Sequence, residues 1–321
     1  MGKKGVILLN MGGPERLEAV EPFLFNLFTD REIIRLGPLF LQRPLAWIIS
    51  KTRTGKTKAN YNLIGGGSPI LKISGRQSEE LEKLLEKNGH SINTYVGMRY
   101  WHPTIENALQ QALADGVDEL LALPMFPQYS KATTGSCFNE MQNVLKNFKS
   151  DVKVKFVESW HQNPMYIEAL NGTVREGFSK IPENIRTRTN VLFSAHSLPK
   201  SFVDEGDPYV GQVEETVDAV KTSLVLTQTH LAFQSRSGPV KWIEPDTKEA
   251  IKELAKKGVK SILMVPISFV SDHLETLYEM DILYKDLAEE LGMSFYRAPA
   301  LNTNQKFVEA LADIVLANWK D

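Results

Sequence analysis

Residues 261 to 266 are Ser-Ile-Leu-Met-Val-Pro, a short and almost wholly apolar run that follows a glycine-containing turn. Such a run predicts a strand that is buried on both faces, as the strands of parallel sheets are. The stretch from Phe269 to Asp281 is mostly polar and predicts a loop that leads into a helix near Asp272. Because ligands of parallel α/β folds bind at the carboxyl ends of the strands, we expect functional groups in this stretch.

The chain also contains an internal repeat with a constant offset of 142 residues. Three pairs of segments align without a gap: Pro103–Ala108 with Pro245–Ala250, Gly116-Val117 with Gly258-Val259, and Pro124 with Pro266. Each copy predicts a helix, a tight turn, an apolar strand and a loop. We therefore predict two similar α/β halves whose strand-end loops face one another across a ligand-binding cleft.

Strands and helices alternate along the chain. Predicted strands are Val6–Asn10, Asn93–Gly97, Leu120–Leu123, Val152–Phe156 and Val191–Phe193. Predicted helices are Leu17–Phe28, Gln77–Lys87, Pro103–Ala114, Thr133–Lys149 and Gln305–Trp319, and Pro124–Thr134 is expected to be an irregular functional loop. This alternation predicts an α/β fold with parallel sheets built from βαβ units.

A length of 321 residues suits two domains better than one small core. We predict an N-terminal domain at residues 1–150 and a C-terminal domain at 151–321. The polar stretch Ser179–Asn190 is the best candidate for a linker or long loop, and the last helix is expected to pack back on the body.

Composition excludes several classes of protein. A formal net charge of −2 gives no reason to expect a nucleic-acid partner. The single cysteine, Cys137, excludes an internal disulfide and any multi-cysteine zinc or iron–sulfur site. The chain lacks a G-x-G-x-x-G motif, and Gly65–Pro69 lacks the Lys-Ser/Thr of a phosphate-binding loop. We find no signal peptide and no run of about 18 apolar residues, so we expect a cytoplasmic location.

One segment, Leu36–Ile49, is strongly apolar, is broken by two prolines and is followed by Lys51, Arg53, Lys56 and Lys58. Two interpretations stay open. It is either a buried core segment or an apolar surface with a basic flank that lies in a membrane surface, since cations beside apolar side chains favour anionic lipid.

Glu275, Glu279 and Asp272 recur three or four residues apart, so they share one face of the predicted helix. Either this face is solvated, or it holds protons or a cation. His196 lies at the end of the strand Val191–Phe193, where a neutral imidazole would act as a base near physiological pH. The alternative is a histidine that only caps a loop.

Seven segments, taken together and in this order, resemble the ferrochelatase family. They are Asn10–Pro14, Tyr61–Ile70, Gly97–Tyr100, Pro127–Ser130 with Thr133–Gly135, Leu192–Pro199, Gln234–Pro239 and Ser271–Asp281. The resemblance implies two Rossmann-like domains and an enzyme, a lyase, that inserts Fe²⁺ into a porphyrin in heme biosynthesis.

The resemblance also assigns residues. It implies that His196 and Glu275 are catalytic and bind the metal, and that Asp272 and Glu279 form a path for protons or metal. The implied porphyrin contacts are Met11, Arg99, Tyr100, Trp242 and Phe269.

Departures from relatives refine these expectations. This chain ends at Asp321 without a cysteine-rich tail and has Lys131 at the position of a cluster cysteine, so no iron–sulfur cluster is expected. Arg99-Tyr100 and segment 36–49 resemble the branch of the family that uses protoporphyrin more than the branch that uses coproporphyrin, which implies protoporphyrin IX and a peripheral membrane contact. The alternatives are coproporphyrin III as substrate, a chelatase for cobalt or nickel, and a porphyrin or heme carrier without turnover.

Overall fold

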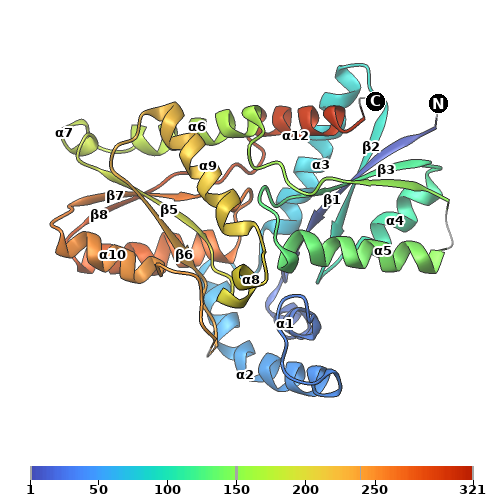
Figure 1. Ribbon diagram of the computed structural model, residues 1–321, viewed down its shortest axis with the longest axis horizontal. Coiled ribbons are helices and arrows are strands. Elements are labelled where there is room, and N and C mark those ends of the chain that lie inside the picture. Colours follow the sequence, from blue (N-terminus) through green and yellow to red (C-terminus); the bar gives the residue numbers. More distant parts are fainter. Residues whose placement is uncertain (1, 149–150, 239, 320–321) are drawn as a thin grey trace. The chain divides into compact units, whose positions relative to one another are not determined.

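The computed structural model describes residues 2–148, 151–238 and 240–319. Its contacts divide the chain into two units, the first made of Met1–Trp160 with Leu311–Asp321 and the second of His161–Ala310. Each unit contains one four-stranded sheet (Figure 1). The predicted division between residues 150 and 151 falls beside a gap in the described residues, and the change of unit comes between Trp160 and His161.

The sheet of the first unit has the strand order β2-β1-β3-β4, with all neighbours parallel. Its strands are β1 (Lys4–Asn10), β2 (Ile92–Met98), β3 (Glu119–Pro124) and β4 (Lys153–Phe156). The central strand β1 is buried from its second residue onward, because helices cover both faces of the sheet (Figure 1). Its side chains Ile7 and Leu9 pack with those of α4 and α5 in one apolar core.

The helices of the first unit are η1 (Leu17–Ala19), α1 (Val20–Thr29), η2 (Leu39–Leu41), α2 (Gln42–Leu63), α3 (Ile70–Lys87), α4 (Ile105–Ala114), the π-helix η3 (Lys131–Gly135) and α5 (Ser136–Phe148). The predicted helix at Gln77 thus begins earlier, at Ile70. The predicted helix at Thr133 begins as a π turn inside the expected loop, and its predicted end at Lys149 lies outside the described residues.

The sheet of the second unit has the order β6-β5-β7-β8 and is also parallel throughout. Its strands are β5 (Asn190–His196), β6 (Thr229–Gln234), β7 (Ser261–Pro266) and β8 (Ser294–Arg297). All six residues of β7 are buried, as the apolar run predicted. The α/β fold class is therefore confirmed.

The helices of the second unit are α6 (Pro164–Ser179), α7 (Glu183–Arg186), α8 (Lys200–Asp204), α9 (Tyr209–Leu224), α10 (Thr247–Lys256), the π-helix η4 (Glu275–Tyr284) and α11 (Lys285–Glu290). The stretch Ser179–Asn190 connects α6 with β5 inside this unit. The last helix, α12 (Gln305–Ala317), crosses into the part of the chain that groups with the first unit, where Lys155 Nζ donates to Asn318 O (3.1 Å).

The predicted repeat is present in the structure. Helices α4 and α10, and strands β3 and β7, occupy ranges that differ by the predicted offset of 142 residues. The N-caps correspond as well: Thr104 and Asp246 each accept hydrogen bonds from backbone N–H groups of the first helical turn. Gly116 and Gly258 both have positive φ, 75° and 81°, which lets the chain turn sharply from helix to strand.

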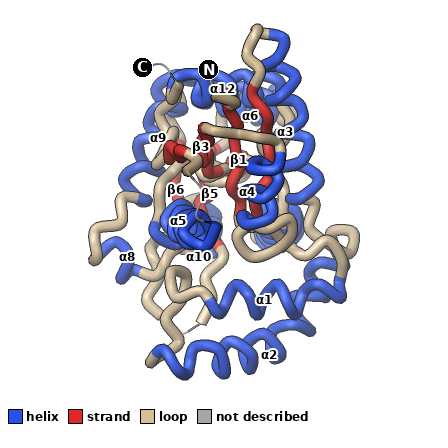
Figure 2. The backbone as a smooth tube through the Cα atoms, turned by 90° about the vertical axis from the view of Figure 1, so that its right-hand side faces the viewer, coloured by secondary structure: helices blue, strands red, loops and turns tan. Residues whose placement is uncertain are grey.

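The apolar segment 36–49 forms η2 and the start of α2, which packs beside α1 away from the sheet of its unit (Figures 1 and 2). Ala46 is buried, but four large apolar side chains are exposed by about half or more: Leu39 75%, Phe40 77%, Trp47 56% and Ile48 49%. The interpretation as a buried core segment is therefore wrong for these four side chains. None of the described helices is long and apolar enough to cross a membrane.

Candidate active site

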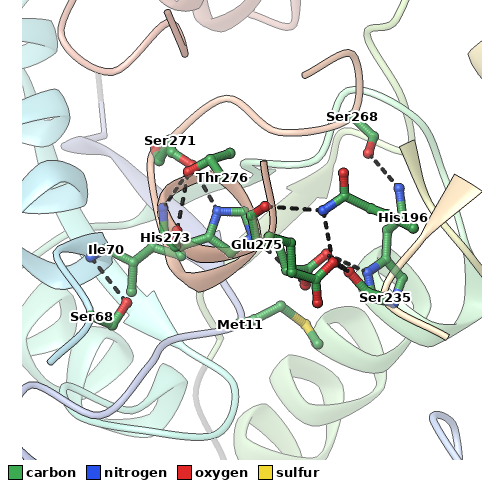
Figure 3. A network of polar contacts seen from close by, with 12 residues as sticks. Met11, Ser68, Ile70, His196, Ser235, Ser268, Ser271, His273, Glu275 and Thr276 are labelled. Atoms are coloured by element: carbon green, nitrogen blue, oxygen red, sulfur yellow. Dashed lines mark hydrogen bonds and ion pairs between the residues drawn. The ribbon is translucent and has the colours of Figure 1, made fainter. Parts of the chain in front are cut away.

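His196 is the last residue of β5 and is held there through its backbone. Its N–H donates to Ser268 Oγ (3.0 Å), and its carbonyl accepts from the hydroxyl of Tyr209 (3.0 Å). Ser268 follows β7 and Tyr209 begins α9, so two neighbouring elements fix this strand end (Figure 3). The imidazole therefore starts from a rigid position, which a precise proton transfer requires.

The imidazole is hydrogen-bonded to Glu275, the first residue of η4. Nδ1 of His196 lies 2.7 Å from Glu275 Oε2, and the two side chains are 37% and 22% exposed (Figure 3). Burial opposes a charged imidazole, but the charge and hydrogen bond of Glu275 raise the pKa of His196 above its usual value. With Nδ1 engaged, Nε2 is the nitrogen that can take a proton from a ligand.

A serine hydroxyl joins two carboxylates of this site. Ser235 Oγ lies 2.6 Å from Glu275 Oε2 and 2.7 Å from Glu279 Oε2 (Figure 3). A hydroxyl has one hydrogen and can donate to only one of them, so the second close contact is best made by a carboxyl that itself carries a proton. Ser235 has a positive φ of 68°, a backbone conformation that is uncommon outside glycine and often found at functional sites.

The two carboxyl groups differ in their affinity for a proton. Burial, and after it the charge of Glu275, raises the pKa of Glu279 to about 7. Burial also opposes ionisation of Glu275, but the charge and hydrogen bond of His196 hold the pKa of Glu275 well below its usual value. Near neutral pH the site thus contains one ionised carboxylate and one carboxyl that gains and loses its proton.

The neighbouring strand β6 supports this arrangement. Gln234 pairs with His196 in the sheet register, and its Nε2 donates to Glu275 O (3.0 Å) and to Glu279 Oε2 (3.1 Å). Tyr284 donates to the same oxygen of Glu279 at 3.3 Å. The predicted shared face of Glu275 and Glu279 is confirmed by their common contact with Ser235, and the alternative of a solvated face is wrong for these two residues.

Asp272 has different partners from the rest of the predicted acidic row. It accepts hydrogen bonds from Arg297 Nη1 (3.2 Å) and Asn302 Nδ2 (2.7 Å), and its side chain is 17% exposed. Arg297 also binds Asp281 through two parallel contacts. The structure therefore brings Glu275 and Glu279 together and places Asp272 in a separate cluster.

Phe269 and His273 lie close to the pair of His196 and Glu275, and Trp242 contacts the chain just beyond His196. The ring of Phe269 lies edge-on to His196, with centroids 6.5 Å apart, and contacts His273 at 4.9 Å. His273 Nδ1 lies 3.0 Å from the carbonyl of Ser271, and its Nε2 lies 3.7 Å from Glu275. Trp242 pairs with Pro199, three residues beyond His196, and its indole nitrogen is buried without a hydrogen-bond partner among the described residues.

In the first unit, Arg99 and Tyr100 form a buried cluster around Asp30. One oxygen of Asp30 accepts from Arg99 Nη2 (2.8 Å), from the Tyr100 hydroxyl (2.5 Å) and from Ser136 Oγ (2.6 Å). Burial opposes ionisation of Asp30, but the hydrogen bonds of Ser136 and Tyr100 and the charge of Arg99 hold its pKa below the usual value. The Tyr100 side chain is enclosed, since the residue is only 2% exposed.

Met11, the remaining predicted contact, follows β1 directly, and its carbonyl accepts the backbone N–H of Tyr100 (3.0 Å). Sequence reasoning assigned no role to Ser235 or Gln234 in the second unit, nor to Asp30 and Ser136 in the first. The sequence singled out the segment Gln234–Pro239, and the register of β6 beside β5 puts Gln234 opposite His196.

Within the described residues, no group of three or more histidine, cysteine, aspartate and glutamate side chains is arranged to hold a metal ion. Imidazole and carboxylate groups together are ligands that suit iron(II), manganese or zinc.

The chain is similar to known proteins over nearly its whole length. The family model described as Ferrochelatase matches residues 3–319. The chain is 48% identical over 328 residues to the ferrochelatase of Gloeobacter violaceus, covering 99% of this chain and 98% of that protein. It is 48% identical over 314 residues to that of Geotalea uraniireducens, with 98% and 97% covered.

Solved structures agree on the fold. The chain resembles "SirB from Bacillus subtilis with Fe3+" with a TM-score of 0.58 at 12% identity, covering 98% of this chain and 95% of that one. It resembles CbiX, described as the terminal enzyme for biosynthesis of siroheme in denitrifying bacteria, with a TM-score of 0.52 at 11% identity, covering 99% and 100%. At such low identity these likenesses support the chelatase fold alone.

Proposed function

The chain belongs to the ferrochelatase family, and we propose that it inserts Fe²⁺ into protoporphyrin IX, with release of two protons, as the terminal step of heme biosynthesis. As a member of that family it is an enzyme of the lyase class, a metal chelatase that acts on a porphyrin. The observation that carries the proposal is the hydrogen bond at the end of β5 in which His196 Nδ1 lies 2.7 Å from Glu275 Oε2.

Porphyrin chemistry explains why such a pair is useful. A free-base porphyrin carries two pyrrole N–H protons, and both must leave before four nitrogens can bind a divalent metal. Nε2 of His196 accepts one of these protons and the other passes to water, while Glu275 stabilises the imidazolium that forms. The imidazolium then gives a proton to Glu275, and the short hydrogen bonds of Ser235 carry a proton on toward Glu279.

His196 and Glu275 are also the proposed ligands of the metal. In this proposal His196 and Glu275 bind Fe²⁺ briefly and the porphyrin nitrogens complete its coordination, which is consistent with the small number of protein ligands. Asp272 was predicted to belong to the same path, but its contacts with Arg297 and Asn302 favour a structural role. We keep Glu279 alone as the second acidic group of the path.

Metal entry also requires the flat macrocycle to bend, at a strain of about 1–5 kcal/mol supplied by binding energy. Side chains that pack against the ring supply this distortion. We propose Phe269, Trp242 and Met11 as such contacts. For Arg99 and Tyr100 a direct contact stays a prediction, since the Tyr100 hydroxyl is bound to Asp30.

An anaerobic assay tests the proposal, with Fe²⁺ offered together with protoporphyrin IX or with coproporphyrin III and metalloporphyrin formation followed by absorbance. We expect faster turnover with protoporphyrin IX. Faster turnover with coproporphyrin III would support the alternative substrate, and binding of either porphyrin without metal insertion would support a carrier.

We further propose that the exposed apolar segment contacts a membrane surface, where a poorly soluble porphyrin resides. Four of its side chains are exposed, and cations lie beside it: Lys51 Nζ is 5.9 Å from the centroid of the Trp47 ring and pairs with Glu21 at 2.6 Å. Replacing Phe40, Trp47 and Ile48 with serine should lower co-sedimentation with anionic liposomes. Unchanged sedimentation would contradict the membrane contact.

No resident cofactor is part of this proposal. The sequence contains one cysteine, Cys137, which is buried in the core of the first unit, so this chain does not offer the four thiolates of an ordinary iron–sulfur cluster. We propose a cytoplasmic enzyme that reaches the membrane surface through segment 36–49.

A further inference from the structure

Arg297 is the last residue of β8 and connects two carboxylates that flank the catalytic groups in sequence. Its Nε and Nη2 donate to the two oxygens of Asp281 (2.5 and 2.9 Å), and its Nη1 donates to Asp272 (3.2 Å). Asp272 precedes η4, and Asp281 lies within it. The guanidinium of Arg297 thus connects two segments to the edge strand β8: the loop before η4 and the second half of η4.

The environment of this cluster is largely enclosed. The side chains of Arg297 and Asp272 are 14% and 17% exposed, and that of Asp281 is 35% exposed. Asn302 adds two further hydrogen bonds to Asp272, one to its backbone N–H and one to its carboxylate. Since burying ions costs free energy that their attraction only partly recovers, such a cluster is weak evidence for stability and better evidence for fixed geometry.

The π-helix is the element that needs such fixing. π-Helices are rare, occur mostly as single turns inside α-helices and are frequent at functional sites, whereas η4 runs for ten residues. In η4, Glu275 and Glu279 must both stay within 2.7 Å of Ser235, which lies on a different strand end. A shift of η4 by about 1 Å would break this shared contact, and the planar, two-point contact with Asp281 restrains translation and rotation together.

We propose that Arg297 is a positioning residue for metal insertion: by binding Asp272 and Asp281 it keeps η4 where Glu275 and Glu279 meet Ser235 and His196. This inference rests on the function proposed above. It also explains why Asp272 and Asp281, which share the acidic stretch with Glu275 and Glu279, have a fixed cation as partner.

The test compares Arg297→Lys, which keeps the charge and loses the two-point contact, with Arg297→Gln and with the control Arg175→Lys. Arg175 forms an ion pair with Glu168 in the same unit and is 54% exposed. We expect kcat for metal insertion to fall about 10- to 100-fold in Arg297→Gln, less in Arg297→Lys and not in the control, with KM for porphyrin changed by less than about threefold. Wild-type kcat in a folded Arg297→Gln variant would overturn the proposal.

A second measurement does not depend on turnover. The proton of the His196–Glu275 hydrogen bond should give a downfield ¹H resonance that disappears in His196→Ala. We expect this resonance to shift or broaden in Arg297→Lys and to stay unchanged in Arg175→Lys. If the wild type inserts no metal, the proposed function fails while this resonance still tests the positioning role. An unchanged resonance in Arg297→Lys would count against that role. Asp281→Asn, which keeps a neutral acceptor, provides the same comparison should the Arg297 variants not fold.

Discussion

The two units place polar clusters at corresponding strand ends but give them different charges. In the first, Arg99 and Tyr100 follow β2 and meet Asp30 and Ser136, the residue after the π-helix η3. In the second, Gln234 and Ser235 lie at the end of β6 and meet Glu275 and Glu279 of the π-helix η4. The repeat therefore produces one architecture with two sets of side chains.

The two clusters differ in the basic side chain that pairs with their carboxylates. Asp30 has the guanidinium of Arg99, and against the effect of burial the hydrogen bonds of Ser136 and Tyr100 together with this charge lower the pKa of Asp30. Glu275 has His196, an imidazole whose pKa is raised, against the effect of burial, by the charge and hydrogen bond of Glu275, and Glu279 has no lysine or arginine partner within the described chain. We infer that the cluster with arginine is structural, whereas the cluster with histidine can exchange protons.

The largest effect is expected from His196→Ala. It removes the base of the titrating cluster, so the rate of metal insertion should fall by about 10³-fold or more, while protoporphyrin still binds. Anaerobic turnover and porphyrin fluorescence quenching measure the two quantities. His230→Ala is the matched control, because His230 belongs to the same sheet and contacts only Asn190 among the described hydrogen bonds. Retained turnover in His196→Ala would contradict the assignment of the base.

Asp30→Asn tests the fixed cluster in the first unit. It removes the buried counter-charge of the Arg99 guanidinium, 18% exposed, and leaves the more exposed Glu140 at 3.7 Å, so the free energy of unfolding should fall by about 3 kcal/mol. Denaturant titration measures this loss. Glu80→Gln is the control, since Glu80 forms an exposed ion pair with Lys83 and should change stability by less than about 1 kcal/mol. An equally small loss in Asp30→Asn would mean that the cluster is not structural.

The pH dependence of stability separates the two clusters. Because the pKa of Glu279 is raised from 4.5 to about 7, the folded state binds more protons than the unfolded state between these values, and stability falls as pH rises through this window. Glu279→Gln lacks this loss. From about pH 5 to pH 8 the wild type should lose up to about 3 kcal/mol relative to the variant. Parallel stability curves for the two proteins would show that Glu279 has an ordinary pKa.

The smallest effect is expected from Ser235→Ala, which removes the hydroxyl between the two carboxylates. The rate of metal insertion should fall about 10- to 100-fold with little change in porphyrin affinity, because proton transfer between Glu275 and Glu279 loses its bridge. Ser223→Ala, at the contact of Ser223 with Asn171, is the control. A wild-type rate in Ser235→Ala would remove the bridge from the mechanism.

Much of the fold could be predicted because the relevant signals are local or repeated. The apolar run at residues 261–266 predicted β7, and the constant offset of 142 residues predicted that α10 and β7 repeat α4 and β3. The strand end at His196 and the shared face of Glu275 and Glu279 follow from the periods of strand and helix. These features need no knowledge of distant contacts.

The remaining features depend on contacts between residues far apart in sequence. Asp272, predicted to join the acidic path, binds Arg297, 25 residues later. The Tyr100 hydroxyl binds Asp30, 70 residues earlier, and the contact of Tyr100 with a porphyrin stays a prediction. Local periodicity does not distinguish the π geometry of η4 from an α-helix. Strand order and register place Gln234 beside His196, and local periodicity specifies neither of them.

The most direct test of the account is a structure with a free-base porphyrin bound. We predict that a pyrrole nitrogen lies within hydrogen-bond distance, about 2.7–3.2 Å, of His196 Nε2, with Glu275 on the opposite side of the imidazole. A macrocycle bound with its pyrrole nitrogens remote from both His196 and Glu275 would contradict the account.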